Sequence, residues 1–155
     1  MTVRARFPDD APDDWHRLDR FESCTISDQL LSVKDHVLVN NSNDNKETTV
    51  NMKNSVYWIA QIVEIRARTE KEVYVLIRWY YRPEELPCGR QKYHGEDEVI
   101  WSDWEQVISA YTIAAKCSCI QWREHKNENE LVQTFYWRQK FCPLKGQLTV
   151  FPFNC

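Results

Sequence analysis

Short segments rich in β-branched and aromatic residues, separated by polar loops, are the feature that most restricts the fold of this sequence. Such composition is typical of β-strands. No segment has the long apolar periodicity of an amphipathic helix, although Ser102 and Glu105 have capping-box spacing, which predicts one helical turn. We therefore predict an all-β fold, a small barrel or a sandwich, with strands within residues 21–26, 36–40, 56–66, 73–81, 99–101, 108–122 and 131–141.

Three polar segments flank or connect these strands. Residues 1–20 are rich in Asp and contain two prolines, which predicts a flexible N-terminal arm with little intrinsic order. Residues 41–55 are rich in Asn and are long for a loop in a small domain, so we expect them to be mobile without a ligand. Residues 123–130 predict a second, solvated loop.

The charge of the chain restricts its partners. The formal net charge is -3, whereas a general nucleic-acid binder usually carries a strong basic surface. We therefore expect no direct binding to duplex DNA and a basic partner instead, with an affinity that falls moderately as salt is added. No apolar stretch is long enough to span a membrane, and the first residues lack the apolar segment of a signal peptide. We expect neither membrane insertion nor secretion.

The cysteines predict reduced thiols and no metal site. Disulfides are rare in proteins that are not secreted. Cys117 and Cys119 are separated by one residue, and no second Cys/His pair is placed to complete tetrahedral zinc coordination. The six cysteines are Cys24, Cys88, Cys117, Cys119, Cys142 and Cys155.

No motif of catalysis is apparent. The chain has only 3 glycines, so a Gly-rich phosphate-binding loop is not predicted, and no Ser or Cys near the histidines has the context of a nucleophile. His94, in "KYHGEDE", has two interpretations, a general base or a turn histidine that bonds backbone or water, and we favour the second. We therefore predict a protein that is not an enzyme and that uses no cofactor.

Aromatic residues gather where two predicted strands meet. Residues 56–66 and 73–81, joined by a turn at 69–71, predict a hairpin. Because side chains alternate along a strand, Trp79 and Tyr81 share one face, near the start of the partner strand. Two interpretations remain open: aromatic packing in the core, which alternation alone favours, or converging ring faces that attract a trimethylammonium group.

Several blocks of sequence resemble a known family. "YWIAQIVEI", "VLIRWYYRPEE", "GRQKYHGEDEVIWSDW" and "VISAYTIAAKC" occur in the order seen in bromo-adjacent homology (BAH) domains, and the resemblance covers roughly Leu31 to Phe141. It is greatest to members that precede a PHD finger in fungal and plant chromatin proteins. The resemblance implies a small distorted SH3-like β-barrel with added strands, long loops and at most short helical turns.

The resemblance also implies a division of the chain. Residues 1–20 would be the arm, residues 21–150 the BAH domain, and residues 151–155 the start of a linker into a PHD finger. Cys155, the last residue of the sequence, would then be the first zinc ligand of that finger. The alternative is a plain terminal cysteine. We expect the domain to be a monomer.

In the relatives that it resembles, the domain reads histone H3 trimethylated at lysine 27 and acts in Polycomb-type transcriptional repression, in the nucleus on chromatin. Carried over by motif, the methyl-lysine cage would be Trp58, Trp79 and Tyr81. We also expect peptide contacts from Tyr57, which has no firm counterpart in the family, and from Glu84, His94 and Asp103. A histidine is usual where Trp104 stands, so the resemblance does not settle peptide contacts from that turn.

Two functions therefore compete. The first is a reader of methylated histone tails, in which replacing Trp79 with alanine would remove the preference for the methylated peptide and leave the fold intact. The second is a BAH module for protein interaction or nucleosome docking, whose aromatic residues are buried and recognise no methyl-lysine. A comparison of methylated and unmethylated peptides separates them.

Overall fold

The computed structural model describes residues 9–40, 57–122 and 134–142, and the backbone of 147–150. Strands dominate these residues, and the only helical segments are three 3-10 turns, η1 (Trp15–Arg17), η2 (Pro83–Glu85) and η3 (Ala110–Thr112). The strands are β1 (Asp19–Phe21), β2 (Ser23–Ile26), β3 (Gln29–Ser32), β4 (His36–Asn40), β5 (Tyr57–Thr69), β6 (Glu72–Tyr81), β7 (Glu98–Ser109), β8 (Ile113–Cys117), β9 (Cys119–Gln121), β10 (Phe135–Cys142) and β11 (Gln147–Val150).

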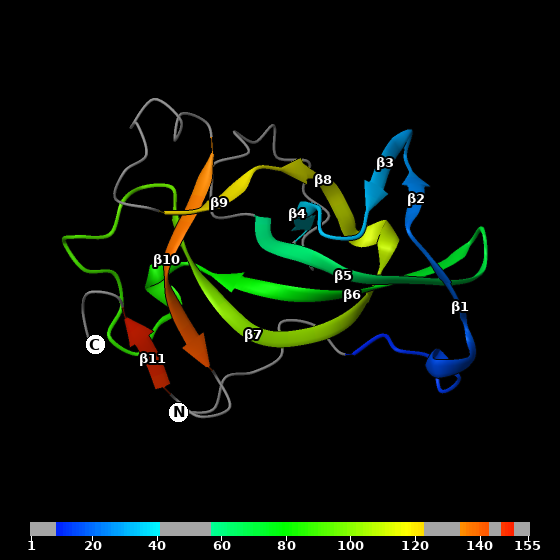
Figure 1. The fold of residues 1–155 in the computed structure, drawn as a ribbon, viewed down its shortest axis with the longest axis horizontal. Coiled ribbons are helices and arrows are strands. Elements are labelled where there is room, and N and C mark those ends of the chain that lie inside the picture. Colours follow the sequence, from blue (N-terminus) through cyan, green and yellow to red (C-terminus); the bar gives the residue numbers. More distant parts are fainter. Residues whose placement is uncertain (1–8, 41–56, 123–133, 143–146, 151–155) are drawn as a thin grey trace.

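The strands form a curled sheet and one separate hairpin. The large sheet has the order β11-β10-β7-β6-β5-β4-β8, with β1 added to β5 and β9 added to β10. The long strands β5, β6 and β7 run side by side, and the β2–β3 hairpin lies at the opposite end of the molecule from β10 and β11 (Figure 1). No pairing closes the sheet into a ring within the described residues. The predicted all-β, barrel-like fold with short helical turns is confirmed.

The sheet curls around the largest of its apolar core clusters. Along β6 the alternation predicted from the sequence is confirmed, because Val75, Ile77 and Trp79 are each 0% exposed on its inner face. The core residues come from strands at both ends of the sheet and from the β2–β3 hairpin, which explains the curl. They include Ile26, Leu31, Val37, Val39, Ala60, Ile62, Ile65, Val73, Tyr81, Ile100, Ile108, Ile113 and Phe141.

The N-terminal residues differ from the predicted arm. Residues 9–20 lie against the domain, and Trp15 and Leu18 are both only 8% exposed. The guanidinium of Arg66, on β5, donates to the carbonyl oxygens of both residues, at 2.9 and 3.5 Å, and stacks 4.9 Å from the Trp15 ring. This anchoring overrides the polar composition that predicted little order. Residues 1–8 lie outside the described residues.

The helical turn predicted at Ser102 is wrong. Strand β7 continues without interruption through this position and pairs with β6 on either side of an irregularity in register. The Ser102 hydroxyl donates to the carbonyl oxygen of Trp79 at 2.6 Å and accepts from the backbone N–H of Trp104 at 3.3 Å. The serine therefore links β7 to β6 through a hydrogen bond. The sequence predicts instead that it caps a helix.

Several predictions fall on residues that are not described. The mobile loop at 41–55, the solvated loop at 123–130 and the linker at 151–155, with Cys155, lie outside the described residues. Cys24, Cys117 and Cys119 are free thiols, as predicted. Cys88 is disulfide-bonded, so the prediction of reduced thiols is wrong there.

None of the described helical segments is long and apolar enough to cross a membrane. In the same part of the chain, His, Cys, Asp and Glu side chains form no group of three that could hold a metal ion.

Candidate functional site

The three residues predicted as a cage lie together at one end of the β5–β6 hairpin. The indoles of Trp58 and Trp79 meet edge to face, with ring centroids 5.6 Å apart and an interplanar angle of 81°. Tyr81 meets Phe141 of β10 in the same manner, at 6.1 Å and 85°. All four rings pack against one core cluster. The hairpin register and strand alternation thus bring together residues that the sequence separates by more than twenty positions.

The rings of Trp58, Trp79 and Tyr81, which together form the aromatic group, differ in burial. Trp79 is 0% exposed and Tyr81 is 4% exposed, whereas Trp58 is half-buried. The indole N–H of Trp79 donates to Oε1 of Gln106 at 3.0 Å, so both the ring and its polar atom are accommodated by the core. Trp79 and Tyr81 therefore have a structural role, and Trp58 is the ring through which the group meets solvent.

The opposite face of β6 carries a polar network that sequence reasoning missed. The guanidinium of Arg78 lies 4.8 Å from the Tyr80 ring and 4.4 Å from the Trp101 ring, and it donates to the carbonyl of Ser102 at 3.0 Å. The Tyr80 hydroxyl lies 3.1 Å from Nε2 of His36. Because side chains alternate along a strand, this network lies on the outer face of β6 while Trp79 and Tyr81 lie on the inner face.

Burial sets the protonation of that network. Desolvation, aided by the nearby charge of Arg78, lowers the pKa of His36 to about 4, and desolvation raises the pKa of Tyr80. Both side chains are therefore neutral near pH 7, and the network contributes a single positive charge, that of Arg78, behind the aromatic group.

The residues predicted to contact a peptide differ in their exposure to solvent. Asp103 is exposed on β7, and Glu84 is exposed in η2, where its carboxylate pairs with Arg90. Tyr57 is half-buried, and its carbonyl oxygen accepts from Arg82 at 3.3 Å. Asp103 thus presents an exposed carboxylate, while the charge of Glu84 is partly offset by Arg90.

His94 is a buried turn residue. Its Nδ1 accepts from the backbone N–H of Gln91 at 2.9 Å, so Nε2 carries the proton and donates to Oε1 of Gln139 at 2.6 Å. The next residue is Gly95, where the hydroxyl of Tyr136 leaves no space for a Cβ atom. A peptide contact at His94 would have to replace one of these bonds, and it stays a prediction.

Trp104 is an additional aromatic residue at this end that the sequence did not assign to the site. It is half-buried and packs against the same core cluster as Trp58, Trp79 and Tyr81. The predicted helical turn obscured its position, because the helix period puts Trp104 opposite Ser102 and Gln106, whereas the strand period puts all three on one face.

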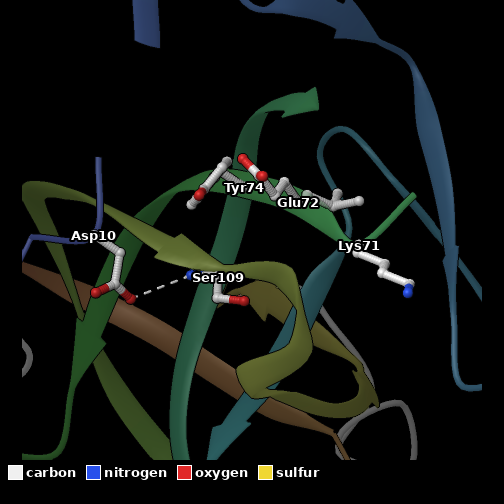
Figure 2. A pocket seen from close by; sticks show the side chains of 6 residues that line it. Asp10, Lys71, Glu72, Tyr74 and Ser109 are labelled. Atoms are coloured by element: carbon white, nitrogen blue, oxygen red, sulfur yellow. Dashed lines mark hydrogen bonds between the residues drawn. The ribbon is translucent and has the colours of Figure 1, made fainter. Parts of the chain in front are cut away.

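A shallow hollow of about 320 Å³ lies elsewhere, at the other end of β6 (Figure 2). Asp10 and Ser109 are joined across it by a hydrogen bond of 3.4 Å between the Ser109 N–H and the Asp10 carboxylate, and the Lys71 side chain extends away from them. None of the predicted site residues is among those that line it: Asp10, Lys71, Glu72, Val73, Tyr74 and Ser109. The hollow and the aromatic group are separate features.

One family model and two plant proteins match this chain. A family model described as "BAH domain" matches residues 29–152. The chain is 36% identical over 93 residues to "Chromatin remodeling protein EBS" of Arabidopsis thaliana, a match that covers 59% of this chain and 40% of EBS. It is 54% identical over 43 residues to "Chromatin remodeling protein SHL" of the same plant, covering 28% of this chain and 19% of SHL.

The fold has a counterpart among solved structures. The crystal structure of the yeast Rsc2 BAH domain matches with a TM-score of 0.58 and 18% sequence identity, covering 80% of this chain and 51% of that chain. At this identity the match establishes a likeness of fold alone. The matched region spans less than half of each plant relative.

Proposed function

This chain belongs to the BAH domain family, and we propose that it is a histone methyl-lysine reader that binds the H3 tail trimethylated at lysine 27. In this proposal it acts in the nucleus on chromatin, in Polycomb-type repression, as a monomer that catalyses no reaction and uses no cofactor. The names of the plant relatives, which describe chromatin remodeling proteins, support the chromatin role. The choice of lysine 27 rests on the resemblance of the cage blocks.

The observation that carries the proposal is the contact between Trp58 and Trp79 beside Tyr81. A trimethylammonium group keeps its charge but donates no hydrogen bond, so aromatic faces attract it at low desolvation cost. Each face contributes roughly 0.5–2 kcal/mol, so three contribute at most about 6 kcal/mol. A micromolar complex needs about 8 kcal/mol, and the peptide main chain and flanking side chains would supply the remainder.

Entry of the ligand requires the two indoles to separate. In the edge-to-face pair, the edge of one ring occupies the face of the other, which is where a methylammonium group would sit. Because Trp58 is half-buried and Trp79 has no exposed surface, Trp58 is the ring that would move. The cage would thus be completed only when the peptide is bound.

Charge supports a basic partner. The chain carries a net charge of -3, and Asp103 presents an exposed carboxylate on the strand that also carries Trp104. Exposed charge pairs are screened over about 8 Å at physiological ionic strength. The contribution of these charges would therefore decrease as salt is added, while the cage contribution would persist.

The burial of Trp79 and Tyr81 favours a second candidate function, a BAH module for protein interaction or nucleosome docking without methyl-lysine recognition. Both residues are accommodated as core residues, so their identity is explained without a ligand. Trp58, whose ring is not needed to fill the centre of the core, is the residue that distinguishes the two functions.

Replacing Trp58 with alanine tests the proposal. Loss of one cage face should lower the ratio of affinities for trimethylated over unmethylated H3 peptides by about 2- to 30-fold, as measured by calorimetry. Tyr111→Ala is the matched control, because Tyr111 is an aromatic residue that is 53% exposed and lies outside the aromatic group. A folded Trp58→Ala protein with an unchanged ratio would leave the interaction module as the function.

A further inference from the structure

We propose that Trp104 is a further peptide-binding residue of the reader site, whose indole N–H donates a hydrogen bond to a main-chain carbonyl of the bound peptide. This inference rests on the proposed function and assigns to Trp104 a part of the binding energy that the cage does not supply. It makes Trp104 sensitive to the peptide main chain and indifferent to methylation.

The position of Trp104 follows from its two neighbours on the inner face of β7. Ser102 bonds both to the Trp79 carbonyl, at 2.6 Å, and to the Trp104 backbone N–H, at 3.3 Å. On the other side, Gln106 accepts the indole N–H of Trp79 at 3.0 Å. Trp104 is therefore flanked by the two residues that hold Trp79 in place, and its ring packs on the cluster that contains the proposed cage.

The polar atom of Trp104 is the unusual feature. Its Nε1 is buried and has no hydrogen-bond partner in the part of the chain that the structure describes. Buried donors are almost always satisfied, and the neighbouring Trp79 shows how this strand does so, with Gln106 as acceptor. A donor held without an acceptor beside an aromatic group is suited to an acceptor that arrives with a ligand.

The chemistry of the ligand identifies that acceptor. A trimethylated lysine side chain has no hydrogen-bond acceptor, so the methylated group itself cannot satisfy the N–H. The carbonyl oxygens of an extended peptide are regularly spaced acceptors, and they are present whether or not the lysine is methylated. The bond would therefore raise affinity for both peptides equally.

The experiment removes the donor and keeps the ring. Trp104→Phe should weaken binding of trimethylated and unmethylated H3 peptides by the same factor, about two- to tenfold, with the affinity ratio retained. In ¹H–¹⁵N spectra of the wild-type chain, the Trp104 indole N–H signal, assigned by its absence in Trp104→Phe, should move downfield as the peptide is added.

Two further variants sharpen the result. Trp101→Phe is the matched control, because Trp101 lies on the same strand, also half-buried, but faces Arg78 on the opposite side of the sheet; it should leave both affinities unchanged. Trp104→His should recover part of the lost affinity, because the imidazole Nε2–H occupies nearly the place of the indole N–H.

Failure of this inference differs from failure of the proposed function. If Trp104→Phe binds both peptides as the wild type does, or loses only the preference for methylation, the donor role is overturned. If the wild type itself binds both peptides equally, the reader function is overturned, and the Trp104 signal then reports whether the donor serves an unmethylated peptide.

Discussion

Replacing Trp79 with alanine is expected to lower the free energy of unfolding by about 3–5 kcal/mol, the usual cost of truncating a fully buried tryptophan. The ring has no exposed surface, and its N–H is bonded to Gln106, so the variant would leave both a cavity and an unpaired acceptor. For a domain of this size, the melting temperature should fall by roughly 6–20 °C. Denaturant unfolding followed by circular dichroism measures the effect.

The prediction made from the sequence is different: it expects Trp79→Ala to leave the fold intact. The structure also supplies controls. Trp79→Phe keeps most of the volume and should cost less than the alanine variant, and Leu30→Ala, at a side chain 54% exposed, should change stability by about 0.5 kcal/mol or less. A Trp79→Ala protein as stable as the Leu30→Ala protein would contradict the buried position of the indole.

Replacing Glu98 with alanine is expected to have an effect of similar size, about 3–5 kcal/mol, because it breaks a buried ion pair from one side. The Glu98 side chain is 0% exposed and Arg138 is 23% exposed, with Nε and Oε2 2.9 Å apart. The second carboxylate oxygen accepts from Arg138 and from the Gly95 N–H, both at 3.0 Å. Alanine would leave the guanidinium and the amide without their acceptor.

Glu96, two positions before Glu98, supplies the control for this experiment. Glu96→Ala removes an exposed carboxylate from the same loop and should be nearly neutral, whereas Glu98→Gln, which keeps the shape and an acceptor but not the charge, should fall between the two. Equal stability of the Glu98→Ala and Glu96→Ala proteins would show that the pair contributes nothing.

Strand periodicity explains what could be predicted from the sequence. The inward alternation along β6 and the hairpin with β5 follow from local composition, and these two features alone place Trp58, Trp79 and Tyr81 together. What alternation could not decide is how much of each ring is covered, because that depends on residues far away in sequence, such as Phe141 on β10. The assignment of these rings to a cage remains a proposal.

The wrong predictions also have a physical origin in long-range contacts. A charged residue within a strand is usually expected to face solvent, and nothing local indicates that Arg66 is 5% exposed and anchors the chain near Trp15. Likewise, Ser102 has the spacing of a helix cap, but its hydroxyl bonds across to Trp79. In both cases tertiary partners override a correct reading of local preference.

The parallel pairing of β10 with β7 has a consequence for the order of folding. Tyr136 pairs with Glu98, so a long loop must close before this contact forms, whereas β5, β6 and β7 pair as antiparallel neighbours. Contacts of long sequence separation form late, so Glu98→Ala should speed unfolding more than it slows refolding. Because Phe141 covers Tyr81 from β10, local release of this late strand would uncover the aromatic group while the central strands stay paired.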